Sequence, residues 1–271
     1  MRPKALVAFD LDGTLLDAEG RWHPEATKAI AALKDAGYAL AVNTGRLGAG
    51  FALEAARRIA PTGLHAYSDG GMIADASGLP KRLMPFSEVE TRRVYEVLRE
   101  FKPPADILTA SRVRLHLPGA PPPHLEEHIA KTGTPSFAAP PEAVLRHPPL
   151  TVWLAGVPEA TWTAMRSLLG DLMETEVHGP HEGRLFVGLR PRGRHKGTGL
   201  IELARAMDVP LERTVMVGDG KNDVPALSTA GLGLAMGNGV EEAKRAADLV
   251  LAPLSEGGLA EAVERIRTRF G

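Results

Sequence analysis

The amino-acid sequence predicts an α/β protein, with a doubly wound, Rossmann-like parallel-sheet core and an inserted α+β module. Near both ends of the 271-residue chain, short apolar runs alternate with stretches of helical periodicity. Between them, short strands follow one another closely instead. Several apolar runs end directly in clusters of polar residues. We therefore expect a core formed by residues 1–81 and 190–271 and an inserted domain formed by residues 82–189.

The N-terminal part of the core begins with a strand. Residues 6–9 form a short apolar run, which is typical of a buried strand in a parallel sheet. A helix follows, because Pro24 suits its first turn, Ile30 and Leu33 share one face, and Gly37 is placed to end it. The remaining expected elements are a strand over 38–42, a helix over 47–59, and a strand over 65–68 that ends in a further polar turn.

The C-terminal part of the core resumes the alternation of helix and strand. Its expected elements are a helix over 199–207, strands over 214–217, 232–236 and 249–251, helices over 224–229 and 241–247, and a terminal helix with Leu259, Val263 and Ile266 on one face. In a sheet of this kind, ligands bind beyond the carboxyl ends of the strands. The polar clusters at those ends therefore mark the expected site.

The inserted domain has a different pattern. It opens with a helix that carries Val89, Val94, Val97 and Leu98. Its other expected elements are strands over 107–108, 113–117, 151–155, 176–177 and 185–189 and a helix over 159–169. Strands joined by short connections indicate an antiparallel sheet with helices on one face.

Composition narrows the possible partners and the possible chemistry. Lys and Arg total 32 against 33 for Asp and Glu, so no excess charge favours nucleic acid or an anionic membrane as a partner. The absence of cysteine excludes disulfides, thiolate metal sites and cysteine nucleophiles. The apolar run after the basic first residues is too short for a signal peptide. We expect a cytoplasmic monomer or homodimer that binds neither nucleic acid nor membrane.

Four polar clusters carry the chemistry. They are Asp10–Thr14, Thr44–Arg46, Arg194–Gly197 and Gly218–Asp223. Together they supply a candidate aspartate nucleophile, a second acid, a hydroxyl, an ammonium and further carboxylates, which suits phosphoryl transfer with a hard metal ion.

In this order, with an insertion between the second and the third, the clusters resemble those of the haloacid dehalogenase (HAD) superfamily of phosphatases. The α+β insertion after Asp69-Gly70-Gly71 and the later segment Ala235–Asn238 are similar to the Cof-type branch, type IIB, which has a C2-type cap domain. The resemblance covers the core through its motifs and the cap through its architecture. It implies a Mg²⁺-dependent phosphomonoester hydrolase that acts on small phosphorylated metabolites, sugar phosphates foremost, through an aspartyl-phosphate.

Two aspartates are the expected catalytic pair. Asp10 is the candidate nucleophile, and Asp12, two residues on in an extended segment, points to the same side. Asp12 is therefore placed to protonate the leaving oxygen and later to take a proton from water. The structural alternatives are a strand-end aspartate that bonds its own turn and a turn residue before Gly13.

The repulsion between these carboxylates requires a cation. The resemblance implies Mg²⁺ held by Asp10, the backbone carbonyl of Asp12 and Asp219, with Asp223 either a ligand or a support for the ligands. Magnesium takes about six oxygens and keeps several waters, so a few protein oxygens suffice. Asn222, expected to contact substrate, and Asp223 also suit a turn and a helix N-cap.

The phosphate is expected to contact the second and third clusters. The Thr44 hydroxyl and the backbone N–H groups of neighbours such as Gly45 would form an anion site at a helix start. Lys196 matches the phosphate-clamping lysine of the family. Taken alone, Thr44 suits a helix cap and Lys196 a solvated position. Arg46 either contacts the phosphate or pairs with an acid at the rim.

The cap and one core residue bear on specificity. His181 and Arg184 lie in a polar stretch that either contacts sugar hydroxyls or a second anionic group of the substrate, or forms a solvated hairpin loop. Asp69 departs from the Cof-type pattern, which usually has Asn there. Its extra charge is expected to change the local hydrogen bonding or to disfavour strongly anionic substrates.

Two other functions fit the same motifs. One is a sugar phosphomutase that passes phosphate between two positions, and the other is a non-catalytic, phosphosugar-binding regulatory protein. Phosphate release without a bisphosphate activator distinguishes hydrolysis from the first. Binding alone needs no nucleophile, so the retained Asp10 argues against the second.

Overall fold

The computed structural model describes residues 2–131 and 134–271, and every element and sheet below refers to them. Met1, which belongs to the expected core, and residues 132–133, which belong to the expected insertion, lie outside the described residues. The chain divides into two compact units. The core unit comprises the residues up to Gly48, Ala52–Arg82 and Arg194–Gly271, and the inserted unit comprises Ala49–Phe51 and Leu83–Gly193.

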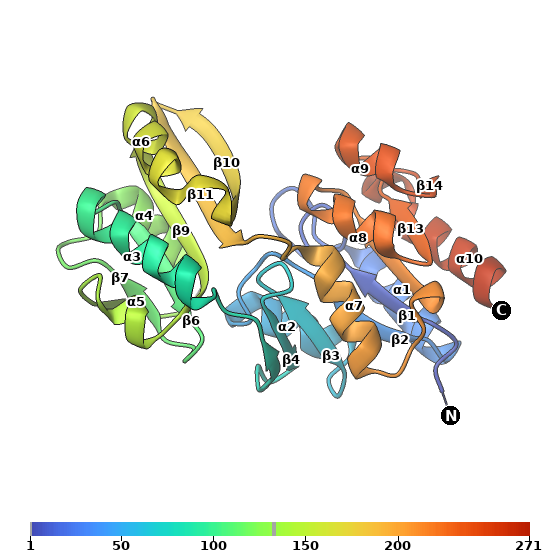
Figure 1. Cartoon of the computed structure of the whole chain (residues 1–271). Coiled ribbons are helices and arrows are strands. Elements are labelled where there is room, and N and C mark those ends of the chain that lie inside the picture. The colour runs from blue at the N-terminus through green and yellow to red at the C-terminus, as the bar shows by residue number, and fades with distance from the viewer. Residues whose placement is uncertain (1, 132–133) are drawn as a thin grey trace. The chain divides into compact units, whose positions relative to one another are not determined.

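The core unit is built on a five-stranded sheet with the order β14-β13-β12-β1-β2 (Figure 1). Strand β1 (Leu6–Phe9) is buried along its whole length and pairs in parallel with β2 (Ala39–Val42) and β12 (Thr214–Gly218). Phe9 lies opposite both Val42 and Val217, so the three strands end within one residue of one another. The residues that follow them, from three distant parts of the sequence, therefore meet at one edge of the sheet.

Helices cover both faces of this sheet. Helix α1 (Pro24–Asp35) packs against α10 (Gly258–Phe270) on one face, and α7 (Lys196–Ala206), α8 (Val224–Thr229) and α9 (Glu241–Ala246) pack in series on the other (Figure 1). The unit also contains α2 (Gly50–Ile59) from Ala52 onward, β13 (Leu232–Ala235), β14 (Leu249–Val250) and 3₁₀ turns at Leu211–Arg213, Lys221–Asp223 and Leu254–Glu256. The predicted doubly wound α/β fold is confirmed.

The strand expected over residues 65–68 is present, but its place in the alternation differs from the prediction. Strand β3 (Leu64–Tyr67) belongs to a separate three-stranded sheet with β4 (Met72–Asp75) and β5 (Pro80–Leu83). Ser68 and Asp69 adopt positive φ values of 53° and 50°, which reverse the chain into an antiparallel pairing with β4. The polar turn expected after this strand is present, and β4, into which its left-handed conformation leads the chain, was not predicted.

Helix α2 begins at Gly50 and not at residue 47, because the preceding loop packs under the small sheet. The carbonyl of Arg46 accepts a hydrogen bond from Ser68 N at 2.9 Å. At Gly48, a Cβ atom would lie 1.9 Å from the Met72 side chain. These contacts keep the segment out of a helix.

Helix α7 begins earlier than predicted. It begins at Lys196, before the expected start at 199, because the His195 side chain caps it by accepting a hydrogen bond from Thr198 N at 3.2 Å. Lys196 is therefore the first residue of the helix, and its backbone is anchored.

A buried histidine joins three elements of the core unit. His65 Nδ1 accepts a hydrogen bond from Val42 N at 3.1 Å, so the ring carries its proton on Nε2, which lies 3.0 Å from the Ala60 carbonyl. Burial lowers the pKa of His65 to about 4, although the Ala60 carbonyl partly offsets this. The neutral ring thus links β2, β3 and the end of α2.

This linkage predicts a pH dependence of stability. In the unfolded chain, His65 becomes protonated as the pH falls below about 6.5. In the folded chain, it becomes protonated only as the pH falls below about 4. The stabilisation is complete above pH 6.5 and is lost as the pH falls toward 4. We expect about 2 kcal/mol of this loss between pH 6.5 and 5, at about 1.4 kcal/mol per pH unit.

Urea unfolding at pH 7 and pH 5 measures this effect. Because other groups also titrate, the relevant quantity is the difference between the wild type and His65→Gln, whose side chain does not titrate. His147→Gln, at an exposed position, is the control and should keep the wild-type slope. Equal pH slopes in the wild type and His65→Gln would contradict the prediction.

The inserted unit is an antiparallel module with one parallel edge pair. Its six-stranded sheet has the order β10-β11-β9-β6-β7-β8, in which only the β7–β8 pair is parallel. Its elements are α3 (Glu88–Phe101), β6 (Ala105–Thr109), β7 (Arg114–His116), α4 (Pro123–Lys131), β8 (Phe137–Ala138), α5 (Ala143–Arg146), β9 (Pro149–Pro158), α6 (Glu159–Leu169), a 3₁₀ turn at Gly170–Leu172, β10 (Met173–His181) and β11 (Arg184–Pro191). Elements α4, β8 and α5 were not predicted.

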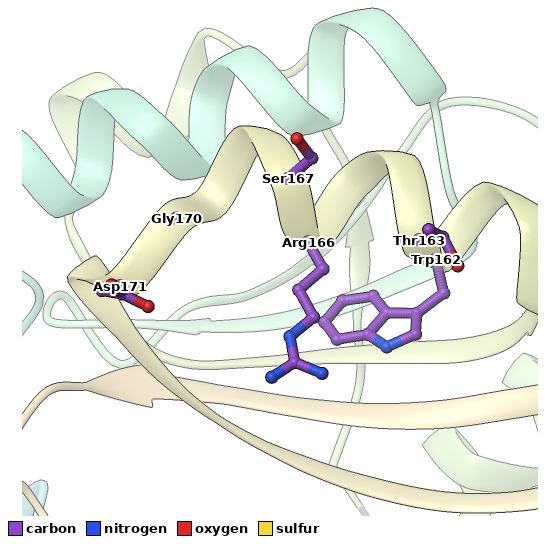
Figure 2. Close-up of a pocket in the computed structure, with 6 residues that line it drawn as sticks. All are labelled: Trp162, Thr163, Arg166, Ser167, Gly170 and Asp171. Atoms are coloured by element: carbon purple, nitrogen blue, oxygen red, sulfur yellow. The ribbon is translucent and has the colours of Figure 1, made fainter.

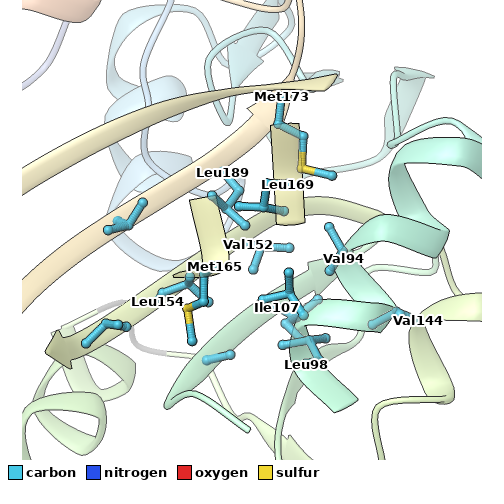
Figure 3. Close-up of a cluster of buried hydrophobic side chains, with 14 of the residues drawn as sticks. Val94, Leu98, Ile107, Val144, Val152, Leu154, Met165, Leu169, Met173 and Leu189 are labelled. Atoms are coloured by element: carbon cyan, nitrogen blue, oxygen red, sulfur yellow. The ribbon is translucent and has the colours of Figure 1, made fainter. Parts of the chain in front are cut away.

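The apolar face of this sheet forms a separate hydrophobic core. Alternate residues of β9 and β11, such as Val152, Leu154 and Leu189, face α3 and α6, which contribute Leu98 and Met165 (Figure 3). All five side chains are buried. The unit therefore has its own core, as the strand periodicity predicts.

A hollow lies along α6 and the 3₁₀ turn that follows it. It is lined by Trp162, Thr163, Arg166, Ser167, Gly170 and Asp171 (Figure 2). These residues belong to none of the predicted polar clusters, and we assign them no chemistry.

Candidate active site

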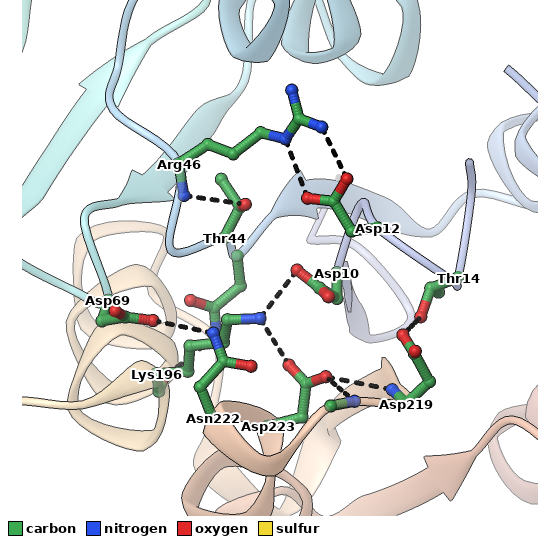
Figure 4. Close-up of polar contacts among 12 residues, drawn as sticks. Asp10, Asp12, Thr14, Thr44, Arg46, Asp69, Lys196, Asp219, Asn222 and Asp223 are labelled. Atoms are coloured by element: carbon green, nitrogen blue, oxygen red, sulfur yellow. Dashed lines mark hydrogen bonds and ion pairs between the residues drawn. The ribbon is translucent and has the colours of Figure 1, made fainter. Parts of the chain in front are cut away.

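A buried lysine lies between two aspartates at the edge of the parallel sheet. Asp10 follows β1, Lys196 begins α7, and Asp223 ends the turn before α8. Lys196 Nζ lies 2.7 Å from Asp10 Oδ1 and 2.6 Å from Asp223 Oδ1 (Figure 4). The side chains of Lys196 and Asp223 are fully buried, and that of Asp10 is 8% exposed. These residues form a charged triad with one excess negative charge.

The triad affects the protonation of its members. Burial raises the pKa of Asp10 well above its ordinary value, the charge of Asp223 raises it further, and Lys196 offsets only part of this. Burial favours the neutral form of Lys196, but the charges of Asp10 and Asp223 outweigh it and raise the pKa of the lysine. Lys196 therefore stays protonated, while Asp10 needs additional positive charge to be fully ionised.

Asp219 adds a third carboxylate beside this triad. Thr14 Oγ1 donates a hydrogen bond to Asp219 Oδ1 at 2.8 Å, and burial raises the pKa of Asp219 to about 6 despite that bond. Asp10, Asp219 and Asp223 each offer a carboxylate oxygen, and these oxygens lie within 4.8 Å of one another. An all-oxygen donor set with uncompensated negative charge fits Mg²⁺.

The three carboxylates are not equivalent as ligands. Asp223 uses Oδ1 for Lys196 and Oδ2 for the backbone N–H groups of Asp219 and Gly220, at 3.0 and 2.8 Å. In the part of the chain that the structure describes, Oδ2 of Asp10 and Oδ2 of Asp219 accept no protein hydrogen bond. The geometry therefore favours Asp10 and Asp219 as direct ligands and Asp223 as a support for the loop and the lysine.

The loop after β1 is shaped to fit Asp219. Gly13 has φ +75°, and a Cβ atom there would lie 2.1 Å from Asp219 Oδ2. Asn238 donates from Nδ2 to the Gly13 carbonyl at 2.8 Å and accepts at Oδ1 from Leu254 N at 2.9 Å. No role was predicted for Thr14 or Asn238, which nevertheless hold Asp219 and this loop.

Asp12 and Arg46 form an ion pair at the more exposed rim. Arg46 Nε lies 2.8 Å from Asp12 Oδ2, and Arg46 Nη2 contacts Asp12 Oδ1 (Figure 4). The Asp12 side chain is 56% exposed and that of Arg46 is 35% exposed. Of the two alternatives for Arg46, the structure shows the pairing with an acid.

Thr44 lies in a turn and not at a helix start. Its hydroxyl accepts a hydrogen bond from Arg46 N at 3.1 Å, and its N–H donates to the Ala66 carbonyl at 3.0 Å. Helix α2 begins only at Gly50, so the expected helix N-terminus beside Thr44 and Gly45 is wrong. The small sheet displaces the helix, and an anion here would contact the turn alone.

Asn222 reaches across this turn to Asp69. Its Nδ2 donates to Asp69 Oδ1 at 3.2 Å. A Cβ atom on Gly45 would lie 3.1 Å from Asp69 Oδ1 and 3.2 Å from Asn222 Nδ2. The glycine therefore lets this side-chain pair lie directly against the backbone of the turn.

A buried asparagine anchors the lysine. Asn43 Nδ2 donates to the Lys196 carbonyl at 2.9 Å, which ties the end of β2 to the start of α7. Asn43 was not predicted as a site residue, although a polar side chain at the end of an apolar strand, directly before Thr44, was a usable signal.

Two predicted substrate contacts, His181 and Arg184, lie in the inserted unit. They face each other in register next to the turn between β10 and β11. Arg184 Nη1 donates to the Gly156 carbonyl at 3.0 Å, and the His181 ring lies 6.2 Å from that of Phe186. The two residues are thus strand residues of the cap, and their role in substrate binding stays a prediction.

The model of the haloacid dehalogenase-like hydrolases matches residues 7–263. The chain belongs to this family. The match spans all four clusters and the inserted unit.

Members of the HAD family with related sequences and folds span nearly the whole chain. The putative phosphatase YkrA of Bacillus subtilis is 26% identical over 268 residues, which cover 96% of this chain and 97% of that protein. The phosphoglycolate phosphatase of Methanothermobacter thermautotrophicus is 26% identical over 259 residues, with 96% and 97% covered. The solved structure of the HAD subclass IIB sugar phosphatase BT4131 has a TM-score of 0.78 at 21% identity, with 97% of this chain and 99% of that chain covered. The expected HAD phosphatase of the Cof-type branch is confirmed.

Proposed function

We propose that this HAD phosphatase is a Mg²⁺-dependent phosphomonoester hydrolase that acts on small phosphorylated metabolites, sugar phosphates foremost, through an aspartyl-phosphate on Asp10. The observation that carries the proposal is the position of Asp10. One of its oxygens is held by Lys196 at 2.7 Å, and the other accepts no hydrogen bond from the described residues. A carboxylate held in this way is oriented for attack.

The metal is assigned to the carboxylate of the nucleophile and to the one beside it. Asp10 and Asp219 would hold it, together with the backbone carbonyl of Asp12, while Asp223 supports the loop. When bound, Mg²⁺ supplies positive charge that offsets the charges of the phosphate and the carboxylates. The raised pKa values of Asp10 and Asp219 support this assignment, because a bound cation would favour the ionised form of both carboxyl groups.

In the first step, Asp10 Oδ2 attacks the phosphorus atom. The O–P bond to Asp10 forms, the bond from phosphorus to the leaving oxygen breaks, and Asp12 transfers a proton to that oxygen. Lys196 and the Thr44–Gly45 turn are proposed to bind the phosphoryl oxygens. Asp12 can carry a proton only when its ion pair with Arg46 is broken. We propose that Arg46 moves to the phosphate when substrate binds.

In the second step, the intermediate is hydrolysed. Asp12, now ionised, takes a proton from water, the water oxygen attacks the phosphorus atom, and the bond to Asp10 breaks. Inorganic phosphate leaves, and Asp10 is restored as a carboxylate. The protons and bonds of the two steps sum to hydrolysis of one ester.

Phosphate release from a panel of phosphorylated sugars, nucleotides, flavin mononucleotide and pyridoxal phosphate tests the proposal. We expect sugar phosphates to be hydrolysed with Mg²⁺ and EDTA to lower the rate to background, because Asp10 and Asp219 then lack the cation. Added Mg²⁺ should restore the rate in full. Activity that persists in EDTA would contradict the metal requirement.

The same assay separates the alternatives. A mutase would require a sugar bisphosphate and would release little phosphate, and a regulatory protein would bind phosphosugars without turnover. Sugar phosphates are placed first because the chain shares its fold with a sugar phosphatase.

The cellular setting is also a proposal. Within the described ranges, no helix is both long and apolar enough to cross a membrane. With a net charge of −1, the chain offers no general attraction to nucleic acid. We propose a cytoplasmic enzyme of small-molecule substrates, and a monomer or a homodimer remains the prediction for its assembly.

A further inference from the structure

Asp69 places a carboxylate against the turn that we assign to the phosphate. Its backbone N–H donates to the Thr44 carbonyl at 3.1 Å, and its side chain accepts from Asn222 Nδ2 at 3.2 Å (Figure 4). A Cβ atom on Gly45 would meet both carboxylate oxygens, at 3.1 and 3.3 Å. The charge of Asp69 is therefore next to the Gly45 backbone and partly shielded from solvent.

This charge acts on the centre of the site. Lys196 Nζ lies 2.7 Å from Asp10 Oδ1 and 2.6 Å from Asp223 Oδ1, and the charge of Asp69 also acts on it. Lys196 thus already faces more than one carboxylate before any ligand binds. The proposed reaction assigns Asp69 no bond-making or proton-transfer step.

We propose that Asp69 is a specificity-determining residue that weakens binding in proportion to the negative charge of the ligand. It favours release of the phosphate product, and it selects phosphoesters of neutral polyhydroxylated alcohols over esters that carry a second anionic group. This inference rests on the proposed function, because it assumes that the Thr44–Gly45 turn binds the phosphoryl group.

The physical basis is Coulomb repulsion in a partly desolvated site. The first phosphoryl group binds because the lysine and the metal compensate its charge. A second anionic group adds its own repulsion from Asp69. We expect the charge of Asp69 to weaken the binding of inorganic phosphate about three- to tenfold. It should weaken the binding of a more distant second anionic group about threefold.

Asp69→Asn tests the charge while keeping the geometry. The Asn side chain retains an oxygen that accepts from Asn222, and Asn tolerates the positive φ of 50°. Asp69→Ala removes the charge and the hydrogen bond together. The matched control is Asp208→Asn, which removes a charge at φ 52° from an exposed side chain that pairs with Arg2.

The readouts are the inhibition constant of inorganic phosphate and the ratio of KM for 6-phosphogluconate to KM for glucose 6-phosphate. In Asp69→Asn, we expect the inhibition constant to fall about three- to tenfold and the KM ratio to fall about threefold, with both differences reduced in 0.5 M NaCl. Asp208→Asn should match the wild type. Asp69→Ala should show the same change in selectivity.

Two outcomes would overturn the proposal. If Asp69→Asn behaves like the wild type and only Asp69→Ala differs, the residue acts through its hydrogen bond to Asn222. If Asp69→Asn changes KM for all substrates equally and leaves phosphate inhibition unchanged, the charge of Asp69 does not select ligands.

A different result concerns the proposed function. If the wild type releases no phosphate from any ester, the proposed function fails. Calorimetric titration of wild type and Asp69→Asn with inorganic phosphate then still decides whether the charge opposes anion binding.

Discussion

Asp10→Asn is expected to lower kcat by about 10⁴-fold or more, because the amide cannot form the phosphoryl ester on which the proposed reaction depends. The change is nearly isosteric and leaves Lys196 paired with Asp223 at 2.6 Å. The fold and the binding of inorganic phosphate should therefore be retained. Steady-state phosphate release, circular dichroism and calorimetric titration with phosphate measure the three quantities.

A matched variant distinguishes the nucleophile from a general loss of charge. Asp17→Asn removes a carboxylate that binds Arg21 outside the site, and it should keep full activity. Acid-quenched enzyme should carry phosphate only when residue 10 is an aspartate. Undiminished phosphate release by Asp10→Asn would refute the assignment of this residue.

Lys196→Met is expected to give the largest loss of stability. The substitution removes the cation between Asp10 and Asp223 and leaves two buried carboxylates without their partner. Removal of one member of a buried ion pair costs about 3–5 kcal/mol. Urea unfolding should show a loss of this order, and Mg²⁺ should stabilise the variant more than the wild type, because Lys196 no longer offsets the charge of the carboxylates.

Two further variants keep this prediction testable. Lys221→Met, at a side chain that is 77% exposed, should change the free energy of unfolding by less than about 0.5 kcal/mol. Lys196→Met combined with Asp223→Asn should recover part of the loss, because one of the two facing charges is removed. Equal stabilities of Lys196→Met and the wild type without Mg²⁺ would show that the triad contributes no net stability.

Local sequence pattern was sufficient for many elements. Helices α6 (Glu159–Leu169) and α8 (Val224–Thr229) have the predicted bounds, because apolar periodicity and flanking turn residues are properties of a short segment. The same applies to β1, whose apolar run ends directly in Asp10. Strand ends predicted in this way also led to Asp10, Thr44 and Asp219, whereas Lys196 was identified through its match to the lysine of the family.

Contacts between distant segments explain most of the differences. The left-handed turn at Ser68–Asp69 directs β3 into its own sheet, and the loop packed under that sheet delays α2 to Gly50. Asn43 and Asn238 act on segments 153 and 225 residues away. A contact between residues so far apart in the sequence produces no periodic pattern in the sequence around either of them.

The sequence by itself determined the order of strands and helices, the insertion, and the chemical groups available at the strand ends, since each depends on neighbouring residues alone. Only the tertiary structure decided which groups meet. In the folded chain, Arg46 pairs with Asp12, and Asp69 lies against the backbone of Gly45. The two oxygens of Asp223 accept hydrogen bonds from Lys196 and from the loop. The physical reason is that hydrogen bonds and charge interactions act over a few ångströms in space, and only the folded chain brings residues from three or more segments within that distance.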